Sequence, residues 1–130
     1  MVYVPMGINW ENATYDEYLK LFDALSNPIR LRILGILFHD RQYVSELARQ
    51  LNISRPLLYM HLRKLEEAGL VEGSAEVSPS GKANKFFQCT DFHVELDMEM
   101  IAALAGTIPQ DLNSKKESTN EKAEKVVFKQ

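Results

Sequence analysis

The sequence predicts a mainly α-helical (α+β) fold that carries one small β-hairpin, and three observations support this prediction. Apolar residues recur at helical spacing through successive segments between residues 15 and 68. Only a tight turn separates the segment 44–51 from the next one, 54–68. Two extended apolar segments around a basic turn follow within residues 70–90. This order of elements is that of a winged helix-turn-helix.

The chain is expected to begin with an extended N-terminal arm, because residues 1–13 show no apolar period. Thr14 and Glu17 then stand in the spacing of a capping box. The two side chains of a capping box bind each other's backbone N–H groups and mark a helix start. A first amphipathic helix is therefore predicted over residues 15–25.

A second, largely buried helix is predicted over 28–39, because Asn27 suits its cap and Pro28 suits its first position. A polar turn is expected at 39–42, before the short helix 44–51. That short helix and the tight turn after it would position the fourth helix.

The fourth helix, about 54–68, carries the clearest functional indication in the chain. Ser54 suits its N-cap, Pro56 its first turn and Gly69 its left-handed end. Its apolar stripe consists of Leu58, Leu62 and Leu65. Its opposite face carries Arg55, Tyr59, Met60 and Arg63. Because arginine and tyrosine can contact base edges and phosphates, the helix suits a DNA major groove. A solvated amphipathic helix is the alternative for this segment taken alone.

The residues after this helix predict a wing, about 70–90. Strands are expected at 70–77 and 86–90, joined by a turn at 79–84 that contains Lys82. A basic hairpin tip directly after a recognition helix can bind DNA phosphates.

The segment that follows the hairpin fits both an extended pattern and a helical period. A last helix is predicted over 97–105, with Asp97 as its cap and Gly106 as its stop. Residues 107–130 are poor in apolar side chains and are expected to form a disordered tail. The predicted domain therefore spans residues 14–106.

Composition places the chain among small cytoplasmic proteins. A length of 130 residues suits one domain. The single cysteine, Cys89, excludes an internal disulfide, fits a reducing compartment and is expected to be a small buried apolar residue. No apolar run reaches the length of a membrane span, and the N-terminus lacks the pattern of a signal peptide.

The formal net charge of −3 is unevenly distributed along the chain. Residues 41–90 contain seven Lys and Arg against five Glu, whereas residues 91–112 contain five acidic residues and no Lys or Arg. The positive balance coincides with the predicted helix-turn-helix and wing. Because the surplus is small, the charge distribution permits DNA binding without requiring it.

Three segments of this sequence resemble the arsenic-repressor (ArsR) family of winged helix-turn-helix regulators. They are L-F-D-A-L-S-N-P-I-R-L-R-I-L at 21–34, V-S-E-L-A-R-Q-L-N-I-S at 44–54 and S-R-P-L-L-Y-M-H-L-R-K-L-E-E-A-G-L-V at 54–71. The resemblance implies a homodimer whose first and last helices form the interface. It also implies that the two recognition helices enter successive major grooves of a pseudo-palindromic site.

The candidate DNA-binding residues fall into three groups. Those expected to reach base edges in the major groove are Arg55, Tyr59 and Arg63. Those expected to contact the phosphate backbone beside it are Arg49, Ser54 and Lys64. Those expected to hold the wing on flanking phosphates or the minor groove are Lys82, Asn84 and Lys85. His61 aligns with a histidine of the family and is expected to pack at the edge of the helix face.

Metal binding is not expected. Many members of the family bind soft metals through two cysteines at the start of the third helix, and Tyr43 and Ser45 replace both here. A second metal site of the family begins with Asp-x-His, which Asp91 and His93 match, but Leu104 replaces its distal histidine. The sequence therefore predicts no metal and no cofactor.

The resemblance and the residues together predict a homodimeric, sequence-specific regulator that binds double-stranded DNA, most simply a repressor. No set of nucleophile, base and acid indicates an enzyme, and no Gly-rich phosphate loop is present. The effector is not identified by the sequence. The alternative is a winged-helix module whose fourth helix contacts protein instead of DNA, and the near-neutral charge and the acidic C-terminal helix leave that alternative open.

Overall fold

The computed structural model describes residues 8–111 and divides the chain into two compact units, the first ending at Val94 and the second beginning at Glu95. The parts of the predicted arm at 1–7 and of the predicted tail at 112–130 lie outside the described residues. Each unit is described by itself below.

Within the described residues 8–111, the first unit contains four α-helices and a three-stranded antiparallel sheet, and the second contains one α-helix. The helices of the first unit are α1 (Tyr15–Leu25), α2 (Pro28–His39), α3 (Val44–Leu51) and α4 (Arg55–Glu67). Its strands are β1 (Gln42–Tyr43), β2 (Val71–Val77) and β3 (Ala83–Cys89). The helix of the second unit is α5 (Met98–Gly106). The winged helix-turn-helix predicted from the sequence is confirmed.

The predicted helix starts are confirmed by their caps. Thr14 Oγ1 accepts from the N–H of Glu17, and the Glu17 carboxylate accepts from the N–H of Thr14, which completes the capping box. Asn27 Oδ1 accepts from two backbone N–H groups in the first turn of α2. Ser54 Oγ accepts from the N–H of Leu57 at 3.2 Å and caps α4. These bonds satisfy N–H groups that have no partner inside a helix.

The turn between α3 and α4 depends on Asn52, whose φ of 56° lies in the left-handed region. Asparagine tolerates this conformation better than most residues with a side chain. The turn is closed by the N–H of Ile53, which donates to the carbonyl of Ala48 at 3.1 Å. The tight turn predicted between the two helices is thereby confirmed.

The sheet has the order β1-β3-β2. Strand β1 pairs with β3 through Gln42 opposite Phe87 and Tyr43 opposite Phe86. The polar turn predicted at 39–42 is therefore wrong at its last residue, because a strand of two residues is too short to show a period-2 pattern.

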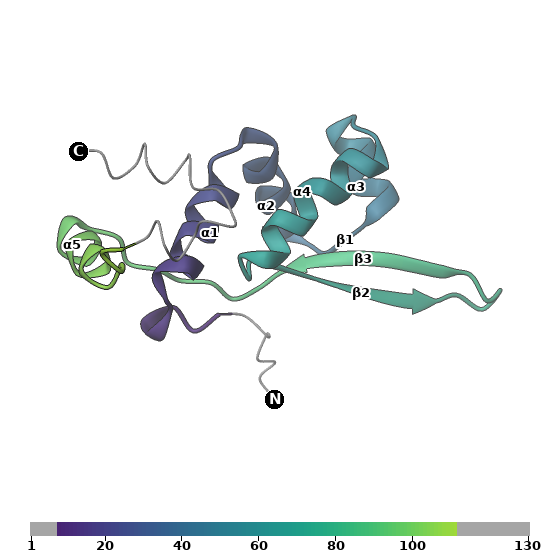
Figure 1. The fold of residues 1–130 in the computed structure, drawn as a ribbon. Coiled ribbons are helices and arrows are strands. Elements are labelled where there is room, and N and C mark those ends of the chain that lie inside the picture. The colour runs from purple at the N-terminus through teal and green to yellow at the C-terminus, as the bar shows by residue number, and fades with distance from the viewer. Residues whose placement is uncertain (1–7, 112–130) are drawn as a thin grey trace. The chain divides into compact units, whose positions relative to one another are not determined.

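The paired strands of the hairpin reach farther toward its turn than predicted. Strand β3 begins at Ala83, three residues before the predicted start, so that the turn is confined to residues 78–82. There the N–H of Ser78 donates to the carbonyl of Lys82 at 2.8 Å. Figure 1 shows this hairpin extending away from the helices of the first unit, with the turn as its outermost part.

The core of the first unit lies between its helices and the root of the sheet. The predicted apolar stripe of α4 is fully buried, together with side chains from the other elements. The largest fully buried side chains are Leu21, Ile33, Leu47, Leu58, Leu62, Leu65 and Phe87. Burying such residues supplies most of the free energy that holds α4 in place.

The extended conformation predicted for the arm is wrong at Trp10–Asn12, which form one turn of 3-10 helix. Trp10 is buried, and its ring lies 5.1 Å from the ring of Tyr18 between centroids. The Tyr18 hydroxyl donates to the carbonyl of Trp10 at 2.9 Å. A single tryptophan can fix a segment to the core without any apolar period in the sequence. The sequence pattern therefore did not indicate this turn.

The second unit is built on α5. Asp97 caps it by accepting from the N–H of Met100 at 2.8 Å, as predicted. The helix includes Gly106, which the sequence placed just beyond its end. No residue of α5 is buried, although Glu99 is its only charged residue. Among the described residues, no helix is long and apolar enough to cross a membrane.

Candidate DNA interface

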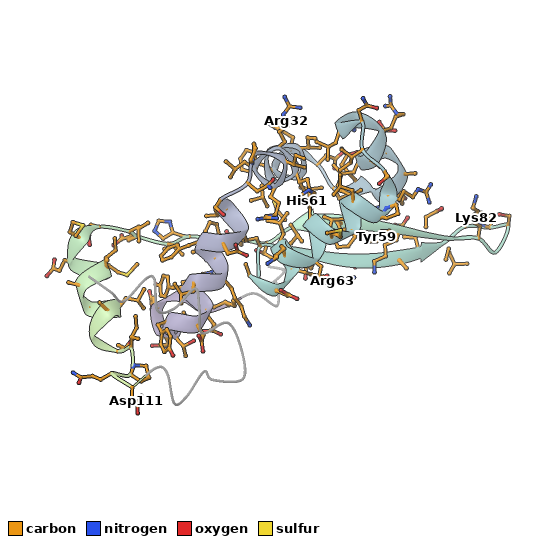
Figure 2. The ribbon with its side chains drawn as sticks, turned by 45° about the horizontal axis from the view of Figure 1, so that its top comes forward. Arg32, Tyr59, His61, Arg63, Lys82 and Asp111 are labelled. Carbon is orange, nitrogen blue, oxygen red and sulfur yellow. The ribbon has the colours of Figure 1, made fainter. Side chains whose placement is uncertain are left out.

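The outer face of α4 is the candidate surface for reading DNA. Its buried side carries the leucines of the core, so helical spacing directs Tyr59, Met60 and Arg63 away from the unit. Met60 is 59% exposed and Tyr59 is 38% exposed. Figure 2 shows Tyr59 and Arg63 on α4 and Lys82 at the far end of the hairpin.

Met60 was not among the candidate residues, although it lies on the same face. It precedes Arg63 by three positions, which places the two side chains on adjacent turns. An exposed thioether between polar groups suits apolar contact with a thymine methyl group. Helical spacing alone could have added Met60 to the candidates.

Arg55 and Arg63 are both exposed at the surface of α4. Within residues 8–111, no acidic side chain forms an ion pair with either of them. Within that part of the chain, no carboxylate therefore holds their guanidinium donors, which can bind an external acceptor. A guanidinium fork can bind the O6 and N7 atoms of guanine or a phosphate.

Lys64, predicted to contact the phosphate backbone, forms an ion pair within the first unit. Its Nζ lies 2.9 Å from Asp23 Oδ2 on α1, so the side chain is directed to α1 and its charge is paired. Helical spacing explains this, because Lys64 leaves α4 on the opposite side from Arg55. A phosphate contact by Lys64 is not supported by this geometry.

Arg49, on α3, is also paired. Its Nε donates to Glu46 Oε1 at 3.1 Å, and its Nη2 donates to Glu46 Oε2. This bond lowers the pKa of Glu46 below its ordinary value. Arg49 is exposed, so a phosphate can reach it. To bind the phosphate, Arg49 must either leave Glu46 or use the N–H groups that Glu46 does not hold.

The predicted wing residues do not share one face of the hairpin. Successive side chains of a strand point to opposite faces, so Asn84 and Lys85 leave β3 in opposite directions. Asn84 lies opposite Glu76 in the register, whereas Lys85 Nζ lies 5.5 Å from the ring centroid of Phe87. Lys82 lies in the turn itself. A DNA surface on one side of the hairpin can therefore be reached directly by Asn84 or by Lys85.

His61, at the edge of α4, packs against the interior as predicted. It is 9% exposed, and its Nδ1 lies 3.3 Å from Arg30 Nη1. Because arginine can only donate, Nδ1 must accept, and the ring is neutral with its proton on Nε2. Burial and the nearby Arg30 charge lower the pKa of His61 below its ordinary value.

This geometry predicts an acid-sensitive step in stability. A lowered pKa means that the unfolded chain takes up the His61 proton first as the pH falls. The stabilisation is therefore complete above about pH 6.5, the ordinary histidine pKa, and is lost progressively below it. Urea unfolding between pH 7.5 and 5 measures this loss.

A control for this step is available in the same protein. His61→Asn keeps an acceptor near Arg30 and removes the titration, so the step should shrink. His39→Asn, at an exposed position on α2, should leave the step unchanged. An equal step in wild type and His61→Asn would contradict the assignment to His61.

Tyr43, which stands where the family resemblance has a metal-binding cysteine, and Cys89 of the wing both hold contacts within the first unit. The Tyr43 hydroxyl donates to Glu76 Oε1 at 2.6 Å. Cys89 is half-buried, and its Sγ donates to the carbonyl of Leu37 at 3.6 Å. Within residues 8–111, no three His, Cys, Asp or Glu side chains come together in an arrangement that could hold a metal ion.

Comparison with known proteins agrees with this fold. The family model described as "Bacterial regulatory protein, arsR family" matches residues 27–73. An uncharacterized HTH-type transcriptional regulator of Methanocaldococcus jannaschii is 42% identical over 88 residues, which cover 68% of this chain and 92% of that protein.

Two solved structures extend the comparison. HlyU from Vibrio cholerae superimposes with a TM-score of 0.50 and 27% identity over 69% of this chain and 86% of its own. The homodimeric winged helix-turn-helix DNA-binding domain Mb0332 of Mycobacterium bovis has a TM-score of 0.52 and 22% identity, over 78% of this chain and 82% of its own, and shows the fold alone.

Proposed function

Because this chain belongs to the ArsR family of DNA-binding transcriptional regulators, we propose that it is a homodimeric repressor that reads its operator with α4. The observation that carries this proposal is the outer face of α4. It presents two arginines without an ion pair to the rest of residues 8–111, beside Tyr59 and Met60. Unpaired guanidinium groups on an exposed helix lose little on binding DNA, because no internal bond must break first.

The position of each residue supports a proposed contact with DNA. Arg55, Tyr59, Met60 and Arg63 enter the major groove, where arginine binds guanine and the apolar groups meet thymine methyls. Ser54 contacts a phosphate at the N-terminus of α4, where its hydroxyl proton and the helix dipole favour an anion.

Supporting phosphate contacts are proposed for the hairpin and for α3. Lys82 in the hairpin turn binds a flanking phosphate, and either Asn84 or Lys85 assists it. Arg49 takes a lesser role because of its bond to Glu46. Lys64 is assigned to packing on α1 instead of to DNA.

Dimerisation through α5 is part of the proposal. Met98 is 74% exposed and Ile101 is 39% exposed, on a helix that buries no side chain of its own. An exposed apolar helix of this kind marks a protein interface. The M. bovis domain with this fold is described as homodimeric, which supports the same arrangement here. A dimer would place two copies of α4 on a pseudo-palindromic operator. We propose that it does so in the cytoplasm.

Repression is the proposed mode of action. A dimer bound across a promoter blocks access to it by occupying the DNA, without a further contact. The proposal includes no enzymatic step, cofactor or metal.

Arg63→Ala is expected to weaken operator binding about 5- to 150-fold, the range of 1–3 kcal/mol for one bidentate base contact. Fluorescence anisotropy with duplexes from the DNA upstream of its own gene measures this loss. Binding to unrelated duplexes should weaken less, because a base contact carries specificity.

Two further variants sharpen the experiment: a control on α2 and a variant of the proposed phosphate contact in the hairpin turn. Arg32→Ala removes the same charge from α2, away from Tyr59, Arg63 and Lys82 in Figure 2, and should leave binding unchanged. Lys82→Ala should weaken all duplexes alike and lower the salt slope by about 1. If the wild-type protein binds no duplex at physiological salt, the protein-binding module becomes the preferred function.

A further inference from the structure

One carboxylate of the hairpin accepts hydrogen bonds from two side chains at the opposite edge of the sheet. Glu76 Oε2 accepts from Arg41 Nη2 at 2.8 Å, and Glu76 Oε1 accepts from the Tyr43 hydroxyl at 2.6 Å. Glu76 lies on β2 and Tyr43 lies on β1, which are separated by β3 in the sheet. The side-chain bonds therefore span the central strand.

Phe86 of β3 lies beneath this cluster. The Arg41 guanidinium carbon is 4.0 Å from the centroid of the Phe86 ring, within the range of a cation–π contact. The Tyr43 ring meets the same ring edge-on, with 5.9 Å between centroids and an angle of 83°. Phe86 itself is buried. The cluster of Arg41, Tyr43, Glu76 and Phe86 thus joins all three strands.

The position of Glu76 along the hairpin makes this contact important. Strand β1 supports β3 only as far out as Phe86, and Glu76 is opposite Asn84, two residues farther toward the turn. Beyond β1 the hairpin consists of two strands, and an isolated two-stranded hairpin is marginally stable in water. Glu76 is therefore a tether from the unsupported part of the hairpin to the segment that begins α3.

We propose that Glu76 is a positioning residue, which holds the hairpin through Arg41 and Tyr43 at a fixed angle to the helix-turn-helix. The DNA-binding consequence rests on the proposed function above. With the hairpin held, Lys82 meets the flanking DNA when α4 is in the groove, and little freedom is lost on binding. The tether connects the wing directly to the start of α3, without a metal or a disulfide.

The sign of the effect of Glu76→Ala separates positioning from simple electrostatics. Removal of a carboxylate near DNA would by itself raise the affinity, because repulsion of the phosphates is reduced. Loss of the tether lowers the affinity instead. We expect Glu76→Ala to weaken operator binding about threefold to tenfold, a modest effect because surface ion pairs are individually weak.

Glu72→Ala is the matched control. Glu72 lies on the same face of β2, four residues earlier, and accepts from Gln88 Nε2 at 3.2 Å near the root of the hairpin. The substitution removes the same charge at the root of the hairpin, on the other side of the β1 pairing from the turn. It should therefore leave operator binding unchanged or raise it.

Tyr43→Phe tests the tether without any change of charge. It keeps the ring on Phe86 and removes only the bond to Glu76. We expect a twofold to fivefold loss of affinity with an unchanged salt slope, and less than additive loss in combination with Glu76→Ala. A lower salt slope for Arg41→Ala, by about 1, would show that Arg41 contacts phosphate and would overturn its assignment to the tether.

A measurement without DNA decides the positioning role independently. In Glu76→Ala, hydrogen exchange of the amides in residues 77–83 should become faster, while exchange in α4 stays the same. On DNA, footprints should lose protection beside each half-site and keep it at the centre. Unchanged hairpin exchange would overturn the tether even if the protein binds DNA. Faster exchange in a protein that binds no operator would retain the tether and refute the proposed function.

Discussion

Ile101→Glu is expected to convert the proposed dimer to a monomer and to weaken operator binding by roughly 10²- to 10⁴-fold. A charge in the centre of an apolar interface would be buried without a partner, which opposes association. A monomer binds one half-site and loses the effective concentration that links the second. Sedimentation velocity gives the mass, and anisotropy on the full operator gives the affinity.

The control for this prediction adds the same charge outside the apolar helix. Gln110→Glu lies in the second unit beyond α5, at an exposed position, and should keep both the dimer and the affinity. Because Ile101 is not buried in the single chain, the fold of the first unit should be the same in both variants. A dimeric Ile101→Glu protein with wild-type affinity would exclude α5 as the interface.

Arg30→Ala is expected to lower the free energy of unfolding by about 3 kcal/mol, the largest loss of stability predicted here. Arg30 is 9% exposed and fixes the end of α1 to α2 and α4. Its Nε donates to the carbonyl of Ala24 at 2.8 Å, its Nη2 to the carbonyl of Asp23 at 3.0 Å and its Nη1 to His61. Alanine would leave the Ala24 carbonyl and His61 Nδ1 buried without a donor.

Thermal unfolding followed by circular dichroism measures this loss as a fall in Tm of roughly 10–20 °C for a domain of this size. Arg32→Ala, two residues away on the same helix and exposed, should change the stability by no more than about 0.5 kcal/mol. Arg30→Lys keeps the charge without the fork and should fall between the two. A Tm of Arg30→Ala within 2 °C of wild type would correspond to a loss of stability of about 0.5 kcal/mol at most. That result would contradict the role assigned to Arg30.

The helical part of the fold was predictable because its signals are local. Thr14 with Glu17, Asn27 with Pro28, and Ser54 each satisfy backbone groups within one turn of the chain. The same locality made the outer face of α4 predictable, because helical spacing separates Arg63 from the leucines whatever they pack against.

Three of the missed features depend on contacts beyond one turn of the chain. Strand β1 exists because Tyr43 pairs with Phe86. Trp10 is buried because its ring packs against the ring of Tyr18. Neither contact leaves a period in the sequence. The partner of Lys64 was missed for the same reason, since Asp23 lies on another helix.

The sequence by itself determined the order of the helices, the caps that begin them and the basic face of α4, because these follow from contacts within a few residues. Only the tertiary structure decided which cations are available to DNA. Lys64 has its acidic partner on another helix, whereas Arg55 and Arg63 have no acidic partner within residues 8–111. It also decided that Glu76 spans the sheet to Tyr43. An ion pair or a tether depends on the distance between side chains that folding brings together, and the spacing of residues along the chain does not contain that distance.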